Sequence, residues 1–224
     1  MKNYLILIAV LLGGILNGFS QRTEMKEYDP GESSSRGSRR EVQTLFNHVR
    51  VTGIHFGFHN SVEQLSNQLG YFSGGQLMLG LNHSFNIGFG AYSLVSDVYS
   101  DYEDENGFKN YFYEYSYGGL LLEPIILDEK LVHLTIPTMV GAGGAVLSQY
   151  RMFNYHFWNQ VNNYPGAVFF VAKAGVNAEL NVTRFFRIGA GVSYRAAVGS
   201  QLPASNDYKN SGFGGNLVFK LGWF

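Results

Sequence analysis

Apolar residues alternate with polar or small residues over most of the chain. A period of two is that of a β-strand, whose successive side chains point to opposite faces. In residues 185–198, Ile188 and Val192 share one face, whereas Arg187 and Arg195 share the other. The alternation predicts eight strands, near residues 48–60, 70–82, 84–98, 110–126, 131–149, 166–181, 185–198 and 212–224.

The connections between these strands alternate in length. Three are short, at 82–84, 127–130 and 182–184, and four are long, at about 61–69, 99–109, 150–165 and 199–211. Short turns at one end and longer loops at the other are typical of bacterial outer-membrane barrels, in which the turns face the periplasm. We therefore predict an all-β fold, an eight-stranded antiparallel up-and-down transmembrane β-barrel with short periplasmic turns and longer extracellular loops.

The two faces of the predicted strands differ in chemistry. Opposite the apolar sets stand small and polar residues, with Lys, Arg and Glu among them in several strands. A charge on the lipid face costs about 2–4 kcal/mol at mid-bilayer, so the polar set is expected to line the lumen. A soluble barrel with an apolar ligand cavity would reverse the faces, but small and charged residues make a poor apolar cavity.

The first residues have the organisation of an export signal. Lys2 precedes the apolar stretch 4–16, and the small residues Gly18 and Ser20 suit cleavage before Gln21. An uncleaved anchor is the alternative, although the apolar stretch is shorter than the roughly 20 residues of a spanning helix. We expect a signal peptide at 1–20, a flexible polar periplasmic leader at 21–46 and the barrel at 47–224. Such an export signal and barrel predict the outer membrane of a Gram-negative bacterium.

The composition limits which partners the protein can bind and which interactions can stabilise its fold. Aromatic residues make up 16% of the chain, and there are 28 glycines and no cysteine. The absence of cysteine excludes disulfides and lipid attachment at a cysteine. A formal net charge of −1 argues against a nucleic-acid partner.

The architecture and several short motifs carry a resemblance. The chain contains SGG, YGG and GAGG runs and ends in GWF. Together with the export signal and the loop asymmetry, these features resemble the small outer-membrane β-barrels of the OmpA-barrel and OmpX-like group, over about residues 47–224. The runs also resemble uncharacterised barrels of Bacteroidota-type bacteria. No diagnostic motif is shared, so the resemblance implies a fold and a location but no functional residues.

A lumen lined by charged residues is the first candidate site. Eight-stranded barrels are filled by their side chains, and buried charges must be paired. We expect a structural network of ion pairs in the lumen, with a path for protons or ions as the alternative. Its predicted members are Glu114, Glu123, Lys173, Glu179, Arg187, Arg195 and Lys220.

Two long loops are candidate contact surfaces. One carries Asp101, Glu103, Asp104 and Glu105, and the other carries Tyr155, Phe157 and Trp158. The acidic loop is either a solvated charge run or a loose site for divalent cations at the lipopolysaccharide surface. The aromatic loop either joins the interfacial girdle of rings or contacts a ligand or partner.

The sequence offers little evidence for a metal site or a catalytic site. His55 and His59 share a strand face but lie about 13 Å apart, too far to share one metal, and His133 is a third scattered histidine. Neighbouring residues His83 and Ser84 point to opposite faces, and no Ser/His/acid set is recognisable. We therefore expect no catalytic, metal or cofactor site.

These features predict a non-enzymatic integral outer-membrane protein with a side-chain-filled lumen and a structural, anchoring or surface-contact role. A narrow channel or a membrane subunit of a transport or secretion assembly is the alternative, followed by a lipid-modifying enzyme. The expected partners are outer-membrane lipid and lipopolysaccharide, with the extracellular loops or the leader as sites for an unknown protein.

The sequence of the final strand does not decide which of its residues face the lipid. Counting back by two from Trp223 gives Leu221, Phe219 and other apolar residues, whereas counting from Phe224 reaches Lys220. Either a bulge near Gly222 shifts the register, or Phe224 turns toward the lumen.

Overall fold

The regular structure of the chain is antiparallel β-sheet. The computed structural model describes residues 50–104, 107–127, 130–149, 165–200, 202, 207 and 209–224, so the predicted signal peptide and leader lie outside the described residues. No helix within these ranges is long and apolar enough to cross a membrane. The described strands are β1 (Val51–Leu65), β2 (Gln68–Leu81), β3 (Phe85–Leu94), β4 (Phe112–Ile126), β5 (Val132–Thr135), β6 (Thr138–Ser148), β7 (Gly166–Thr183), β8 (Phe186–Val198) and β9 (Gly212–Trp223).

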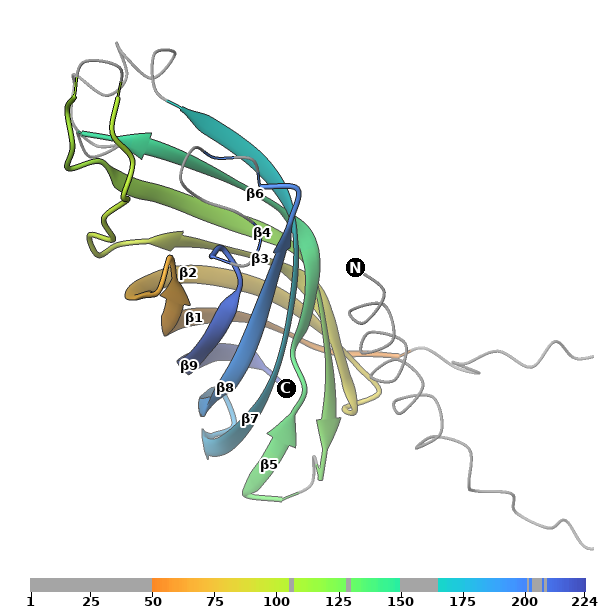
Figure 1. Cartoon of the computed structure of the whole chain (residues 1–224). Helices are drawn as coiled ribbons and strands as arrows, with labels where there is room; N and C mark the ends of the chain where they lie inside the picture. The colour runs from red at the N-terminus through yellow and green to blue at the C-terminus, as the bar shows by residue number, and fades with distance from the viewer. Residues whose placement is uncertain are drawn as a thin grey trace, which may run out of the picture. The chain divides into compact units, whose positions relative to one another are not determined.

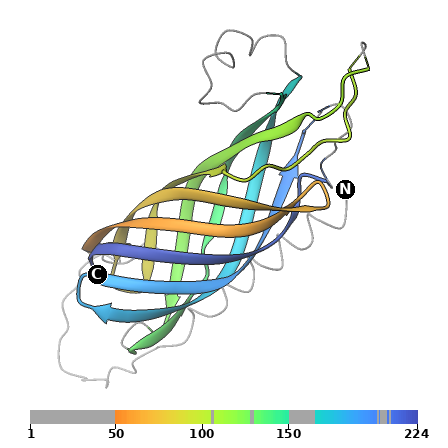
Figure 2. The same cartoon turned by 90° about the vertical axis from the view of Figure 1, so that its left-hand side faces the viewer.

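The strands close into a ring. Strands that follow one another in the chain pair antiparallel, except that β5 and β6 each pair with β4 and β7. The ring is completed where β1 pairs with β9, from Ile54↔Trp223 to Glu63↔Gly214. Figures 1 and 2 show the resulting tilted barrel. Because the ring is closed, neither sheet edge is left unpaired. This confirms the predicted all-β up-and-down barrel.

The described strands number nine, yet the barrel has eight strand positions. β5 and β6 follow one another between β4 and β7, separated by Ile136 and Pro137. Proline has no N–H to donate to a ladder. The neighbouring groups remain bonded, since Ile136 N donates to Pro124 O at 3.1 Å and Gly175 N donates to Pro137 O at 2.9 Å. Pro137 therefore interrupts one strand without opening the ring.

One predicted loop is wrong. The first connection, expected as a long loop at about 61–69, is a two-residue turn between Leu65 and Gln68. Its residues Ser66 and Asn67 have φ values of 51° and 61°, the left-handed pair that a tight hairpin requires. The strand pair therefore extends several residues further than the sequence analysis predicted.

The other connections keep the predicted asymmetry. Residues 82–84, 127–131 and 184–185 are short and lie at one end of the barrel, the turn end. Residues 95–111, 149–165 and 199–211 are longer and join strands at the opposite end, the loop end. The Ser66–Asn67 hairpin also lies at the loop end.

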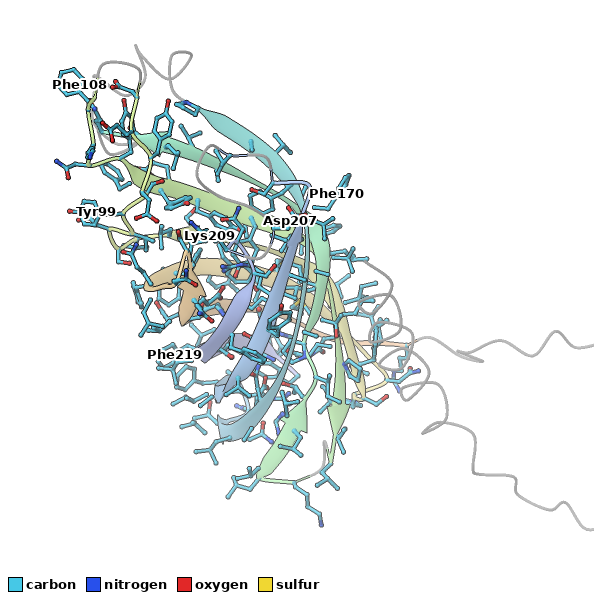
Figure 3. The ribbon with its side chains drawn as sticks, viewed as in Figure 1. Tyr99, Phe108, Phe170, Asp207, Lys209 and Phe219 are labelled. Atoms are coloured by element: carbon cyan, nitrogen blue, oxygen red, sulfur yellow. The ribbon has the colours of Figure 1, made fainter. Side chains whose placement is uncertain are left out.

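Large apolar side chains cover the outside of the ring. Phe170, Val168 and Phe89 are 75%, 77% and 69% exposed, and Figure 3 shows Phe170 and Phe219 pointing away from the ribbon. Inward positions of the same strands are buried and are mostly aromatic, polar or charged. The barrel is thus apolar outside and polar inside.

The register of β9 resolves the question left by its sequence. No bulge interrupts the pairing of β9 with β1 or β8. Leu221 and Trp223 are exposed, whereas Lys220 is buried. Phe224 lies on the inner side, with its ring centroid 4.9 Å from that of His55. Of the two alternatives, the inward turn of Phe224 holds.

Candidate functional site in the charged lumen

The loop half of the lumen contains a buried carboxylate with two cationic partners. Glu63 of β1 accepts a hydrogen bond from Lys173 Nζ at 2.6 Å on Oε1 and pairs with Arg195 through Oε2. Tyr117 donates its hydroxyl to Glu63 at 3.0 Å, and Ser61 donates at 2.7 Å. We call Glu63, Lys173 and Arg195 the Glu63 cluster. Its three strands, β1, β7 and β8, are not all neighbours, so the cluster spans the lumen.

Arg195 also donates hydrogen bonds to backbone carbonyls at the loop end. Its Nε donates to Asn210 O at 3.4 Å, and its Nη2 donates to Gln64 O at 3.0 Å. Its guanidinium carbon lies 4.9–5.3 Å from the ring centroids of Phe72, Tyr115 and Tyr117. Contacts of this kind add cation–π attraction to a desolvated charge. The cluster is therefore continuous with an aromatic layer and with the base of the 199–211 connection.

The turn half holds the inverse arrangement, one cation between two carboxylates. Lys220 Nζ lies 2.6 Å from Glu123 Oε1 and 2.5 Å from Glu179 Oε1. Asn86 donates to Glu123 at 2.6 Å, and Thr135 donates to Glu179 at 3.0 Å. We call Lys220, Glu123 and Glu179 the Lys220 cluster. All three side chains are at most 2% exposed.

The two clusters carry opposite formal charges. One carboxylate and two cations give the Glu63 cluster +1, and two carboxylates and one cation give the Lys220 cluster −1. Buried ions lose hydration and are retained only where partners and hydrogen bonds compensate. Removing one partner of such a group costs about 3–5 kcal/mol. The clusters act as two charged layers that fill the lumen and hold strands from opposite sides together.

A small cavity of about 20 Å³ separates the layers. Lys173 borders it from one cluster and Glu123 from the other. His59 and Asn216 also line it, and His59 Nε2 and Asn216 Oδ1 are buried without a hydrogen-bond partner. A space of this size holds about one water molecule. The described strands thus enclose at least one small cavity between the two clusters.

The structure brings five of the predicted lumen residues into these clusters: Glu123, Lys173, Glu179, Arg195 and Lys220. Arg187 lies nearer the turn end, with its guanidinium carbon 3.8 Å from the Phe224 ring centroid. Arg187 and Phe224 thus lie together at the turn end of the lumen.

The predicted inward position of Glu114 is wrong. Tyr113, Tyr115 and Tyr117 are the buried residues of this part of β4, and Glu114 alternates with them as a partly exposed residue. Glu114 and Glu123 are nine residues apart, an odd separation, so an uninterrupted strand places them on opposite faces. Parity alone excludes their sharing the lumen.

Glu63 is the functional residue that sequence reasoning missed. It falls within the region predicted as a loop, 61–69. The signal that could have found it is the continued alternation of Ser61, Glu63 and Leu65, all of which are buried. Without Glu63, the predicted lumen lacked the carboxylate that pairs with Lys173 and Arg195.

The inward histidines contact different groups. The ring centroid of His59 lies 4.7 Å from that of Tyr92, and His133 Nε2 lies 3.4 Å from Glu179 Oε2. In the described part of the chain, no group of three or more His, Cys, Asp or Glu residues is arranged to hold a metal ion.

The described residues of the acidic loop, 95–104 and 107–111, extend beyond β3 and β4 and bond to one another. Asp104 accepts a hydrogen bond from Phe108 N at 2.8 Å and one from the Tyr111 hydroxyl at 3.2 Å. Glu103 pairs with Lys109 at 3.0 Å, and Asp101 lies 3.7 Å from Lys209. Figure 3 shows Tyr99, Phe108 and Lys209 in this loop-end region. The carboxylates described here have protein partners, while Glu105, Tyr155, Phe157 and Trp158 lie outside the described residues.

Known structures with a similar fold are small barrels. The chain is similar to the N-terminal β-barrel domain of Pseudomonas aeruginosa OprF (7% identity, TM-score 0.49), covering 77% of this chain and 98% of that one. It is similar to Neisserial surface protein A (9% identity, TM-score 0.49, 75% and 95% covered). It is also similar to Ail, the attachment invasion locus protein of Yersinia pestis, solved with the heparin analogue sucrose octasulfate (14% identity, TM-score 0.43, 76% and 96% covered).

No protein-family model matches the chain, and no curated protein is significantly similar to it. Similarity as distant as that to OprF, NspA and Ail does not indicate a shared activity. The assignment to small up-and-down β-barrels rests on the strand pairing and side-chain placement of the chain itself.

Proposed function

We propose that the protein is an integral outer-membrane β-barrel of a Gram-negative bacterium, with its turn end toward the periplasm. The observation that carries this proposal is the closed ring with apolar side chains outside and ion pairs inside. Only structures whose backbone groups are all paired are stable in hydrocarbon, and a closed barrel meets that condition. In water, the same exterior would expose an extensive apolar surface.

Two measurements test the membrane assignment. After reconstitution into lipid vesicles, the protein should resist extraction by alkaline carbonate, and unboiled samples should migrate differently from boiled samples in SDS gels. Recovery in the soluble fraction with a single gel mobility would contradict the proposal.

Within that class, we propose a non-conducting barrel that anchors and presents its loop end. The Glu63 and Lys220 clusters support a filled lumen, because both lie across it with ion pairs between strands that are not neighbours. The extension, described at residues 95–104 and 107–111, supports surface contact. The Gln68 side chain holds it in place by donating to Tyr99 O at 2.7 Å and accepting from Tyr99 N at 3.2 Å. The wild-type barrel in a planar bilayer should show no steady conductance.

A narrow conducting path is the second candidate. The cavity between the clusters favours it, because His59 and Asn216 present buried polar atoms there. A steady current through the wild-type protein would favour this candidate, or a role as membrane subunit of a transport assembly, over the filled barrel.

Catalysis is not part of the proposed function. The described contacts of His55, His59 and His133 are with Phe224, Tyr92 and Glu179, respectively, and not with a serine nucleophile. Mass spectra of lipid A and phospholipids should be the same with and without the gene. A lipid species lost on deletion and restored by the wild-type protein would indicate an enzyme instead.

Outer-membrane lipid, lipopolysaccharide and a protein partner at the loops remain proposed partners. The exposed Phe108 at the 95–111 extension supports a surface contact there. Phe108→Ser should weaken adhesion or partner capture by whole cells while leaving the heat-dependent gel shift unchanged.

A further inference from the structure

The two charged clusters lie at different heights of the lumen. Glu63 lies three residues before Ser66, the first residue of the hairpin turn at the loop end. Glu123 and Lys220 each lie three residues before the last residue of their strands, β4 and β9, which end at the turn end. The cavity of about 20 Å³ lies between the clusters, bordered by Lys173 of one and Glu123 of the other. An ion that moves along the lumen therefore meets the two clusters one after the other.

The net charges of the two clusters are opposite in sign and are buried. With histidines neutral, one carboxylate and two cations give the Glu63 cluster +1, and two carboxylates and one cation give the Lys220 cluster −1. Lys173 is 8% exposed, and the other five charged side chains are at most 2% exposed. Water and salt screen buried charges less than surface charges, so each net charge acts strongly on an ion in the lumen.

Each cluster repels the ions that the other attracts. A cation is repelled at the Glu63 cluster and attracted at the Lys220 cluster, whereas an anion is attracted at the first and repelled at the second. Charged side chains of one sign in a pore select ions of the opposite sign. Two layers of opposite sign in series act differently, because the slower step limits passage and attraction at one layer does not remove repulsion at the other. The pair of layers therefore opposes ions of both signs.

We propose that the Glu63 and Lys220 clusters form a bipolar charge filter, in which the first excludes cations and the second excludes anions. This inference rests on the proposed filled barrel and adds which residues exclude which ions. The second cation of the Glu63 cluster gives it the net charge that repels cations, and the second carboxylate of the Lys220 cluster gives it the net charge that repels anions. A neutral molecule is repelled by neither. The cavity between the layers suits such a molecule, because His59 Nε2 and Asn216 Oδ1 are buried there without a hydrogen-bond partner.

Two single substitutions neutralise one layer each and leave that layer with an ion pair. Lys173→Met leaves Glu63 paired with Arg195, so the net charge of the Glu63 cluster falls from +1 to zero. Glu179→Gln leaves Lys220 paired with Glu123, so the net charge of the Lys220 cluster rises from −1 to zero. All other charges of the chain are the same in the two variants. A difference between them in ion preference therefore comes from the substituted layer.

The test is slow uptake of radioactive rubidium and chloride by liposomes that contain the full chain, which detects leaks too small for a steady current. The pH is held at about 8, where free histidine side chains are neutral, because His133 lies 3.4 Å from Glu179. Relative to wild type, Lys173→Met should raise the ratio of rubidium to chloride uptake about tenfold, and Glu179→Gln should lower it about tenfold. A tenfold change is about 1.4 kcal/mol, within the interaction of one buried unit charge with a nearby ion.

Leu121→Ala is the matched control, because it enlarges the cavity without changing a charge and should leave the uptake ratio unchanged. If a charge variant lacks the heat-dependent gel shift, Arg195→Gln or Glu123→Gln neutralises the same layer and should move the ratio in the same direction. Unchanged ratios in folded charge variants, or shifts in the same direction at both layers, would overturn the bipolar charge filter while the wild-type barrel stayed non-conducting. Steady conductance of the wild-type protein would instead overturn the proposed filled barrel.

Discussion

Single residues in the lumen follow from chain parity and from the need to pair buried charge. The alternation in 166–181 and 185–198 was enough to predict Lys173, Glu179 and Arg195 as inward residues. It could not say which cation meets which carboxylate, because that depends on shear and on strands far apart in sequence. Glu63 was missed because the tight turn at Ser66–Asn67 was not recognised. Glu114 was placed inward although it is an odd number of residues from the inward Glu123.

Glu63→Gln should lower the free energy of unfolding by about 3–5 kcal/mol, because it leaves Lys173 and Arg195 buried without their shared carboxylate. Glu103→Gln removes a carboxylate from an exposed pair with Lys109 and should cost at most about 1 kcal/mol. Urea unfolding of both variants in lipid vesicles measures the difference. Equal losses would show that the Glu63 cluster is not a buried ion pair.

Replacing Lys173 and replacing Lys220 should lower the stability of the barrel to different extents, because the two lysines have different ion-pair partners. Lys173→Met leaves Glu63 paired with Arg195, whereas Lys220→Met leaves Glu123 and Glu179 without the lysine between them. Two buried carboxylates that lose their common cation repel each other. The Lys220 variant should therefore unfold at lower urea than the Lys173 variant, and the reverse order would contradict the assigned partners.

At the scale of elements, the sequence predicted the positions of the strands but not the boundary at the end of β1. Period-two alternation locates the strands to within a few residues of their observed bounds, because each strand has one apolar and one polar face. The Ser66–Asn67 turn carries no glycine, so its sequence gives a weak hairpin signal. Pro137 was hidden within the strand predicted at 131–149, because its neighbours keep the ladder closed around it.

Asn67 should accept glycine and reject a β-branched residue. Its φ of 61° lies in the left-handed region, which glycine enters freely and valine does not. Asn67→Val should lower the free energy of unfolding by about 1–3 kcal/mol, and Asn67→Gly should leave it nearly unchanged. Urea unfolding of the pair measures both, and equal effects would contradict the two-residue turn.

The closing contact between β1 and β9 can be tested by crosslinking, since the chain has no cysteine of its own. Phe58 and Phe219 face each other across this pair of strands. Opposite residues of antiparallel strands lie about 4.5–5.5 Å apart at Cα, within the range of a disulfide. Phe58→Cys with Phe219→Cys should crosslink on oxidation, as seen in non-reducing gels. Phe58→Cys with Leu221→Cys is the control displaced by two residues, and efficient crosslinking there would contradict the register.

For the whole molecule, the sequence predicted the barrel fold, but it did not predict how the charged side chains are arranged in the lumen. A closed ring follows from strand number, turn lengths and face chemistry, all of which are local patterns. The placement of a +1 cluster toward the loop end and a −1 cluster toward the turn end is a property of the assembled barrel. Conduction depends on that placement, because the two layers lie one after the other along the lumen.

Because the Glu63 and Lys220 clusters lie one after the other along the lumen, removing one of them should affect conductance less than removing both. In planar bilayers, Lys173→Met and Lys220→Met should each remain without steady current, because the other cluster and the aromatic layer around Arg195 still fill the lumen. The double variant disrupts both layers and should give more current than the sum of the single variants. The heat-dependent gel shift is the control that each barrel is folded. Equal current in a folded single variant and the double variant would mean that one cluster alone blocks the lumen.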